Sequence, residues 1–168
     1  MSEKQKLSIE GEIENSNLSE NLQKHTLDFI TFLINNEFSI KPEDDGNGWQ
    51  IIYKNECVGH MNFTYEYIGH NAAIWIDTCD FGSGGSTDDV LKETTWEHVR
   101  ICEHFSSGGK QCGCGKQPGF NKTIFGKEYK NICFSFLEFM DPEVKTLENI
   151  KKLMLLLKQS KGNMQSSK

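Results

Sequence analysis

The sequence lacks both a long apolar run and a secretory signal pattern near residue 1. Its longest aliphatic-type run, Leu153–Leu157, is far shorter than the ~20 apolar residues that a membrane-spanning helix needs. Residues 1–20 are polar and acidic, whereas a secretory signal carries a hydrophobic region there. We therefore expect a protein without a membrane association, located in the cytoplasm.

An excess of basic residues is also missing. The chain has 18 Lys and Arg against 24 Asp and Glu, which gives a formal net charge of −6 at pH 7. Proteins that bind nucleic acid through its phosphates need a basic face, so nucleic acid is not an expected partner. Lysines do become more frequent near Lys110–Lys130, which allows a small anion site. A small molecule or a protein remains as the expected partner.

The cysteines do not have the setting of a disulfide scaffold. There are six, at positions 57, 79, 102, 112, 114 and 133, in a chain of 168 residues that also has 11 Phe, 4 Tyr and 3 Trp. A chain of this length buries a sizeable core without covalent cross-links. With no secretory signal, reduced or metal-bound thiols are therefore the expected state.

The hydrophobic pattern predicts a single α+β domain over residues 18–158, between a flexible leader at 1–17 and a flexible tail at 159–168. An antiparallel sheet of about five strands is expected to pack against three helices in the order αβββαββα. The helices are predicted near residues 19–36, 86–106 and 142–158, and the strands near 49–54, 57–65, 71–78 and in a hairpin at 123–139. Ser19, Ser86 and Asp141 are the expected N-caps. A change of apolar parity between Ile132 and Phe139 indicates a bulge or a strand covered on both faces.

The least core-like segment is Lys110–Gly119, KQCGCGKQPG, where two cysteines stand one residue apart. Cys112 and Cys114 offer two soft ligands for zinc, which prefers four ligands in a structural site. His98 and Cys102 would complete a Cys₃His set if both lie on one side of the helix predicted over 86–106. Cys133 and His104 are substitutes. The alternative is that Cys102 packs as a small apolar residue.

The same loop allows thiol chemistry. Lys110 and Lys116 flank the two cysteines, and neighbouring cations favour a thiolate. A nucleophile would also require a base such as His104 or His98 within reach. The alternative is a pair of unreactive loop thiols.

A second candidate site lies on the predicted sheet. On the strand near 57–65, Cys57, Met61 and Phe63 are expected to share the core face, and His60 and Asn62 to face away from the core. Trp75 and Asp77 are expected to share a face on the next strand. Side chains of these types line small-molecule clefts. The alternative is the ordinary solvent face of a half-buried meander.

The segment from Cys112 to Cys133 resembles a group of small uncharacterised bacterial proteins of unknown function. The likeness rests on CGCGKQPG, on Phe125-Gly126-Lys127 and on Asn131-Ile132-Cys133, and it extends from about Trp49 to the last helix. It implies a recurring domain in a bacterial cytosol, and it implies no catalytic residue.

Two functions are consistent with these patterns. The first is a non-enzymatic module that binds a small ligand or a protein through the sheet and the 110–119 loop. The second is a zinc- or thiol-dependent site built on Cys112 and Cys114. The first is the preferred hypothesis, because no acid–base pair or nucleophile arrangement is specific enough in the sequence.

Overall fold

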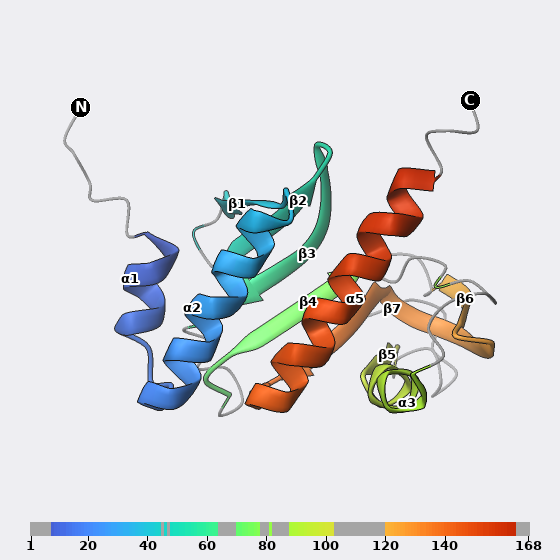
Figure 1. Cartoon of the computed structure of the whole chain (residues 1–168). Helices are drawn as coiled ribbons and strands as arrows, with labels where there is room; N and C mark the ends of the chain where they lie inside the picture. Colours follow the sequence, from blue (N-terminus) through green and yellow to red (C-terminus); the bar gives the residue numbers. More distant parts are fainter. Residues whose placement is uncertain are drawn as a thin grey trace. The chain divides into compact units, whose positions relative to one another are not determined.

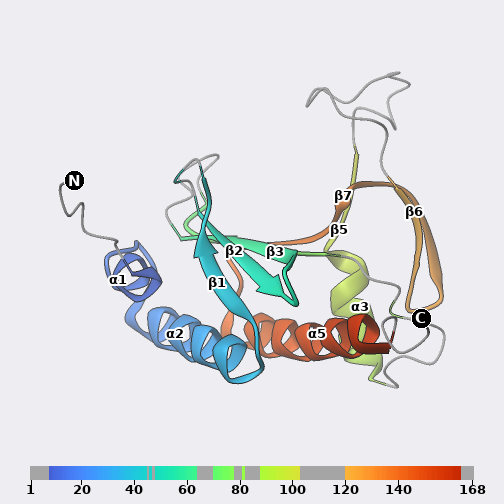
Figure 2. The same cartoon turned by 90° about the horizontal axis from the view of Figure 1, so that it is seen from above.

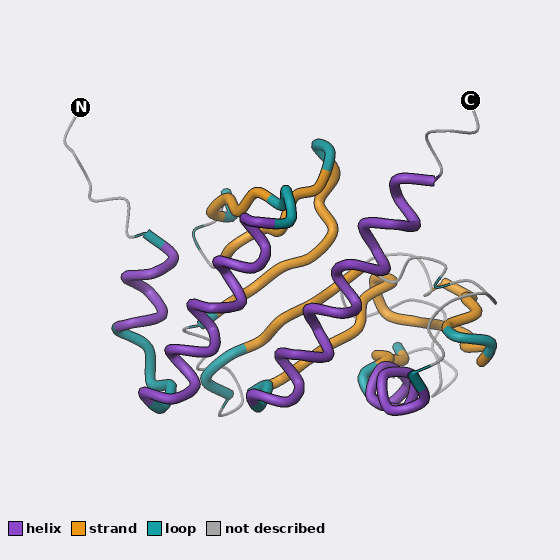
Figure 3. The backbone as a smooth tube through the Cα atoms, in the orientation of Figure 1, coloured by secondary structure: helices purple, strands orange, loops and turns teal. Residues whose placement is uncertain are grey.

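The computed structural model describes residues 8–44, 46, 48–63, 70–77, 81, 88–102 and 120–163. These residues form four helices and seven strands (Figures 1 and 3). In chain order they are α1 Ile9–Glu14, α2 Glu20–Asn35, β1 Ser39–Pro42, β2 Trp49–Tyr53, β3 Glu56–Asn62, β4 Ala73–Asp77, α3 Asp89–Glu97, β5 Val99–Ile101, β6 Phe120–Ile124, β7 Lys127–Met140 and α5 Val144–Asn163.

The predicted α+β class with an antiparallel sheet is confirmed, but the number and order of elements differ. The strands are hydrogen-bonded in the order β1-β2-β3-β4-β7-β5, and β6 pairs with β7 outside this path. The predicted order αβββαββα omits α1, β1 and β5. All three are short, at six, four and three residues, and a short segment does not show a sustained period.

The chain divides into two compact units. Unit 1 comprises Met1–Ile74 and Phe139–Lys151, and unit 2 comprises Trp75–Glu138 and Lys152–Lys168. The elements β4, β7 and α5 each run through both. The prediction of a single domain over residues 18–158 stays a prediction. No helix in the described part of the chain is long and apolar enough to cross a membrane.

Unit 1 is built around α2, which lies on one face of strands β1–β3 (Figures 1 and 2). Ser19 caps this helix as predicted, because its hydroxyl accepts a hydrogen bond from the Leu22 N–H. The buried side of α2 carries Phe29, Ile30 and Leu33. Ile34, near the end of the helix, is 55% exposed.

Helix α1 lies inside the segment that was expected to be a flexible leader. Ser8 caps it by accepting from the Gly11 N–H, and Ile9 and Ile13 are buried. The carboxylate of Glu12 accepts a 2.7 Å hydrogen bond from Trp49 Nε1. These contacts hold α1 against the start of β2.

In unit 2, the helix predicted over 86–106 is much shorter. Asp88 caps α3 by accepting from the Leu91 N–H, and the helix ends at Glu97. Val99 and Ile101 then pair with β7 as strand β5. Both are β-branched and favour extended backbone. The predicted cap Ser86 lies outside the described residues.

The hairpin predicted at 123–139 is confirmed. Ile124 pairs with Lys127, and the two turn residues Phe125 and Gly126 have φ of 48° and 80°, as a type I′ turn requires. The parity change along β7 corresponds to an irregular register, because Val99 pairs with Leu137 whereas Ile101 pairs with Ile132. Of the two predicted alternatives, a bulge or a strand covered on both faces, this register shift supports the bulge.

Asp141 does not cap the last helix, because α5 begins at Val144. Its Oδ1 atom accepts hydrogen bonds from the N–H groups of Asn71 (2.7 Å) and Ala72 (3.1 Å). Its Oδ2 atom lies 2.7 Å from His70 Nδ1. Burial pushes the pKa of this carboxyl upward, but the His70 hydrogen bond and the two backbone donors outweigh it and hold the pKa below its ordinary value. Asp141 therefore clamps the chain entering β4.

We expect Asp141→Ala to lower the free energy of unfolding by about 1–3 kcal/mol, since it removes three hydrogen bonds at a partly exposed site. Asp141→Asn should cost less, because it keeps one acceptor and because Asn tolerates the φ of 44° at this position. Because the pKa of the Asp141 carboxyl is lower in the folded than in the unfolded protein, this group stabilises the folded state at pH values above the unfolded pKa. The stabilisation disappears as the pH falls through the folded pKa. Urea unfolding from pH 7 to pH 2 should therefore show the Asn variant and the wild type converging in acid. A constant gap at every pH would contradict the clamp.

Candidate active site

A β-bulge in β3 decides which side chains share a face of the unit 1 strands. Ile51 of β2 pairs with Gly59, and the next residue, Ile52, pairs with Cys57. Val58 is therefore the extra residue of a bulge. Two strand residues three positions apart normally face opposite sides, but the bulge brings Cys57 and His60 to the same side.

This bulge corrects one prediction. The sequence pattern placed Cys57 on a common face with Met61 and Phe63. Met61 and Phe63 are buried, at 0% and 2% exposure, whereas Cys57 is exposed. The predicted alternation of buried and exposed residues fails here because two neighbouring residues, Val58 and Gly59, are both buried.

Cys57, His60 and Glu43 form a line of three interacting side chains. The Sγ atom of Cys57 lies 3.5 Å from His60 Nε2, and His60 Nδ1 lies 2.7 Å from Glu43 Oε1. The side chains of His60 and Glu43 are 28% and 26% exposed. This is the order of nucleophile, base and orienting carboxylate that activates a nucleophile in many covalent enzymes.

The turn between β1 and β2 places Glu43 beside His60. The Glu43 N–H donates to the Gly48 carbonyl at 2.9 Å, and the Gly46 N–H donates to the Glu43 carbonyl at 3.0 Å. Gly48 has a φ of 152°, and a Cβ at this position would lie 2.7 Å from the Met61 carbonyl oxygen. Glycine is therefore required where the turn passes the backbone of β3.

The electrostatics of the pair favour a thiolate and an imidazolium. Partial burial pushes the pKa of the Cys57 thiol upward, and the Glu43 charge acts in the same direction. The hydrogen bond and the charge of His60, with a backbone hydrogen bond of Gly59, outweigh both and lower that pKa. The hydrogen bond to Cys57 has the largest effect on His60. It exceeds the opposing effect of burial and, with Glu43, raises the pKa of His60 to about 9. Each partner thus stabilises the charged form of the other.

The residues predicted to line a common sheet pocket are divided between the two units. His60 and Asn62 belong to unit 1, and Trp75 and Asp77 belong to unit 2. Asn62 is largely buried, at 9% exposure. A pocket that all four share stays a prediction.

Trp75 and Asp77 have partners within unit 2. Trp75 Nε1 donates to Glu138 Oε1 at 3.0 Å, and Arg100 donates to the same oxygen at 2.6 Å. The two carboxylate oxygens of Asp77 lie 4.0 Å and 3.8 Å from the ammonium groups of Lys122 and Lys161. These contacts form a polar network on β4 and its neighbours.

The premise of the predicted zinc site is wrong in one respect. His98 and Cys102 do not lie on one helix, because α3 ends at Glu97. His98 Nδ1 contacts the Thr94 carbonyl at 2.6 Å, and Cys102 is buried and donates its N–H to the Asn131 carbonyl. Among the described residues, no group of three or more metal-ligating side chains could hold a metal ion.

Four of the predicted site residues lie outside the part of the chain that the structure describes. They are Lys110, Cys112, Cys114 and Lys116. The substitute ligand His104 lies outside it as well. The zinc site on the 110–119 loop therefore stays a prediction.

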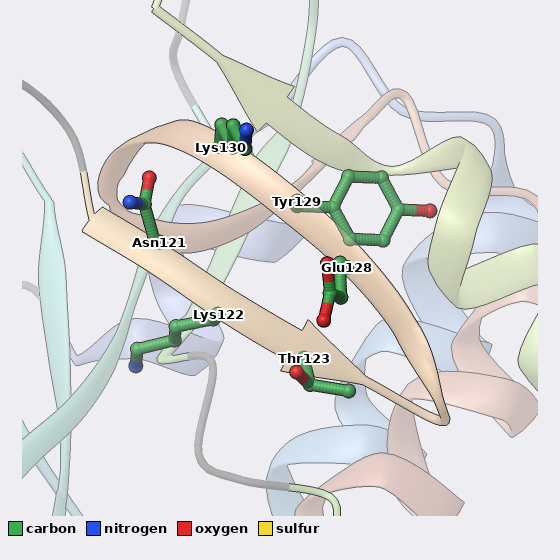
Figure 4. A pocket seen from close by; sticks show the side chains of 6 residues that line it. All are labelled: Asn121, Lys122, Thr123, Glu128, Tyr129 and Lys130. Atoms are coloured by element: carbon green, nitrogen blue, oxygen red, sulfur yellow. The ribbon is translucent and has the colours of Figure 1, made fainter.

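A polar cavity of about 560 Å³ lies on the β6–β7 hairpin of unit 2 (Figure 4). Side chains from both strands line it: Asn121, Lys122, Thr123, Glu128, Tyr129 and Lys130. Beside it, the ammonium of Lys127 lies 5.4 Å and 5.2 Å from the ring centres of Trp96 and Tyr129. The lining of this cavity is polar, as in many ligand-binding sites, but it contains no paired nucleophile and base.

We expect the alkylation of Cys57 by iodoacetamide to follow a pH midpoint below that of an ordinary cysteine, because His60 stabilises the thiolate. In His60→Gln the midpoint should rise to the ordinary value or above, since partial burial and the Glu43 charge then oppose only the Gly59 hydrogen bond. Peptide mapping by mass spectrometry separates Cys57 from the other five cysteines, and buried Cys102 is an internal control. An unchanged midpoint in the His60 variant would show that the pair does not activate the thiol.

No family model matches the chain, and neither does any curated protein or solved structure. The resemblance based on the Cys112–Cys133 pattern stays a prediction. The case for a function depends on the geometry around Cys57.

Proposed function

We propose that the protein is a thiol-dependent acyl-transfer enzyme in which Cys57 is the nucleophile, His60 the acid and base, and Glu43 the residue that orients His60. The observation that supports this proposal is the continuous contact from Sγ through the imidazole to the carboxylate, at 3.5 Å and 2.7 Å. Three residue types in these positions and this order perform nucleophilic catalysis on unrelated folds.

The proposed reaction has two steps. The Cys57 thiolate attacks the carbonyl carbon of an acyl donor, the bond from that carbon to the leaving group breaks, and the Nε2 proton of His60 passes to the leaving amine or alkoxide. The product is a thioester on Cys57. In the second step His60 takes a proton from water or another acceptor as that acceptor attacks the thioester, and the Cys57 thiolate leaves. The acyl group has then passed from the donor to the acceptor, and the site returns to its starting state.

Acyl transfer fits the site better than disulfide exchange does. An amine or alkoxide leaves only when an acid protonates it, and a histidine held by a carboxylate provides that acid. A thiol leaving group has no such need. Cys57 is also the one cysteine in the sequence of unit 1, so this unit supplies no second thiol to form a disulfide with it.

The proposal revises the preferred sequence hypothesis of a non-enzymatic binding module. It retains the thiol chemistry of the alternative hypothesis but moves it from Cys112 and Cys114 to Cys57. The cytoplasmic location expected from the sequence agrees with it, because a reducing compartment keeps an exposed thiol reduced. A binding role for the β6–β7 cavity is compatible with an enzyme site in unit 1.

The direct test is to trap the acyl-enzyme. Incubation with p-nitrophenyl acetate should release nitrophenolate in a burst and add one acetyl group to Cys57, located by peptide mapping. Cys57→Ser should abolish the burst, and His60→Gln should slow it at neutral pH. Nitrophenolate leaves without protonation, so the loss reflects the smaller thiolate fraction, about tenfold for each unit by which the pKa of Cys57 rises. Glu43→Gln should cause a smaller loss, because Glu43 acts only through His60. Acetylation of Cys57 at equal rates in the wild type and the His60 variant would contradict the proposal.

A further inference from the structure

The strand register extends the site across the sheet in two rows. One row runs from His60 to Gln50 on β2 and to Lys41 on β1, and the neighbouring row runs from Cys57 to Ile52 and Ser39. Residues paired directly across antiparallel strands have their side chains on the same face. These six side chains therefore share the face of the strands that carries Cys57.

This is the face away from α2. Ile51 and Tyr53, which alternate with Gln50 and Ile52 on β2, are buried in the core. Gln50 and Ile52 are half-buried, and Lys41 is exposed. A molecule lying over the strands from Cys57 toward β1 would meet first an apolar and an amide side chain and then a cation.

The distance from the nucleophile to this cation follows from sheet geometry. Neighbouring strands lie about 4.8 Å apart, so the backbone of Lys41 is about 10 Å from that of His60. Lys41 is the one lysine or arginine of β1–β3. Glu43, which directly follows β1, is engaged by His60 at 2.7 Å.

We propose that the acyl substrate carries a carboxylate about two strand spacings from the carbonyl that Cys57 attacks, and that Lys41 binds this carboxylate. Gln50 and Ile52 would contact the chain that connects the two groups. This inference rests on the proposed function for the identity of the reacting carbonyl. An exposed ion pair of this kind contributes about a two- to fivefold preference.

The test uses a pair of thiol reagents that differ only in charge. 6-Maleimidohexanoate and its primary amide add to the Cys57 thiolate, and only the first has a carboxylate, separated from the reactive carbon by an extended linker. The ratio of their rates at Cys57, measured by peptide mapping at low salt, reports the preference for an anion. Lys41→Gln should lower this ratio by about two- to fivefold without changing the rate of the amide.

Lys24→Gln is the matched control. It removes the same charge from an exposed position on α2, the helix on the opposite face of these strands, and should leave the ratio unchanged. An unchanged ratio in Lys41→Gln, or an equal fall in both variants, would overturn the inference.

Maleimide addition requires no acyl transfer, so the two proposals can fail separately. A Lys41-dependent ratio without acyl-enzyme formation would refute the enzyme proposal and leave an anion-binding site beside a reactive thiol. An acyl-enzyme without a Lys41-dependent ratio would keep the enzyme proposal and reject the anion site.

Discussion

The bulge at Val58 is the constraint on which the candidate site depends. It inserts one residue into β3, so that Cys57 and His60 face the same side although three positions separate them. The same step keeps Met61 and Phe63 in the core. The bulge therefore has two consequences. The apolar face of β3 stays continuous, and the Cys57 thiol lies next to the His60 imidazole.

A second constraint acts at the turn that carries Glu43. The backbone of Gly48 passes so close to the Met61 carbonyl that a side chain would collide with it. The resulting turn brings a carboxylate from the end of β1 to the imidazole of β3, 17 residues further along the chain. Since a carboxylate on Nδ1 leaves Nε2 to face the sulfur, the turn determines which nitrogen of His60 meets Cys57.

The sequence predicted the fold in those segments where the hydrophobic period is long. The amphipathic stripe and the Ser19 cap of α2, the strands β2–β4 and the β6–β7 hairpin all follow from local pattern. The helix predicted over 86–106 was wrong after Glu97, because the pairing of Val99 and Ile101 with β7 is a long-range interaction that a local period does not contain. Asp141 was wrongly assigned as a helix cap for a similar reason. Its partners are 69–71 residues away.

The candidate site was only half predicted. His60 was identified as an outward-facing polar residue, but Cys57 was placed in the core and Glu43 was given no role. A glycine inside a strand is a signal of a bulge, and Gly59 follows Val58 directly, so a bulge could have been suspected. The contact of Glu43 with His60 depends on a turn geometry that composition alone does not specify.

The most direct test of the thiolate–imidazolium pair is an NMR titration of the His60 ring. The hydrogen bond to Cys57 is the largest single cause of its raised pKa, so the ring should titrate at about 9 in the wild type. In Cys57→Ser the midpoint should fall toward the ordinary histidine value of about 6.5. A midpoint near the ordinary value in both proteins would contradict the pair and remove the basis of the proposed chemistry.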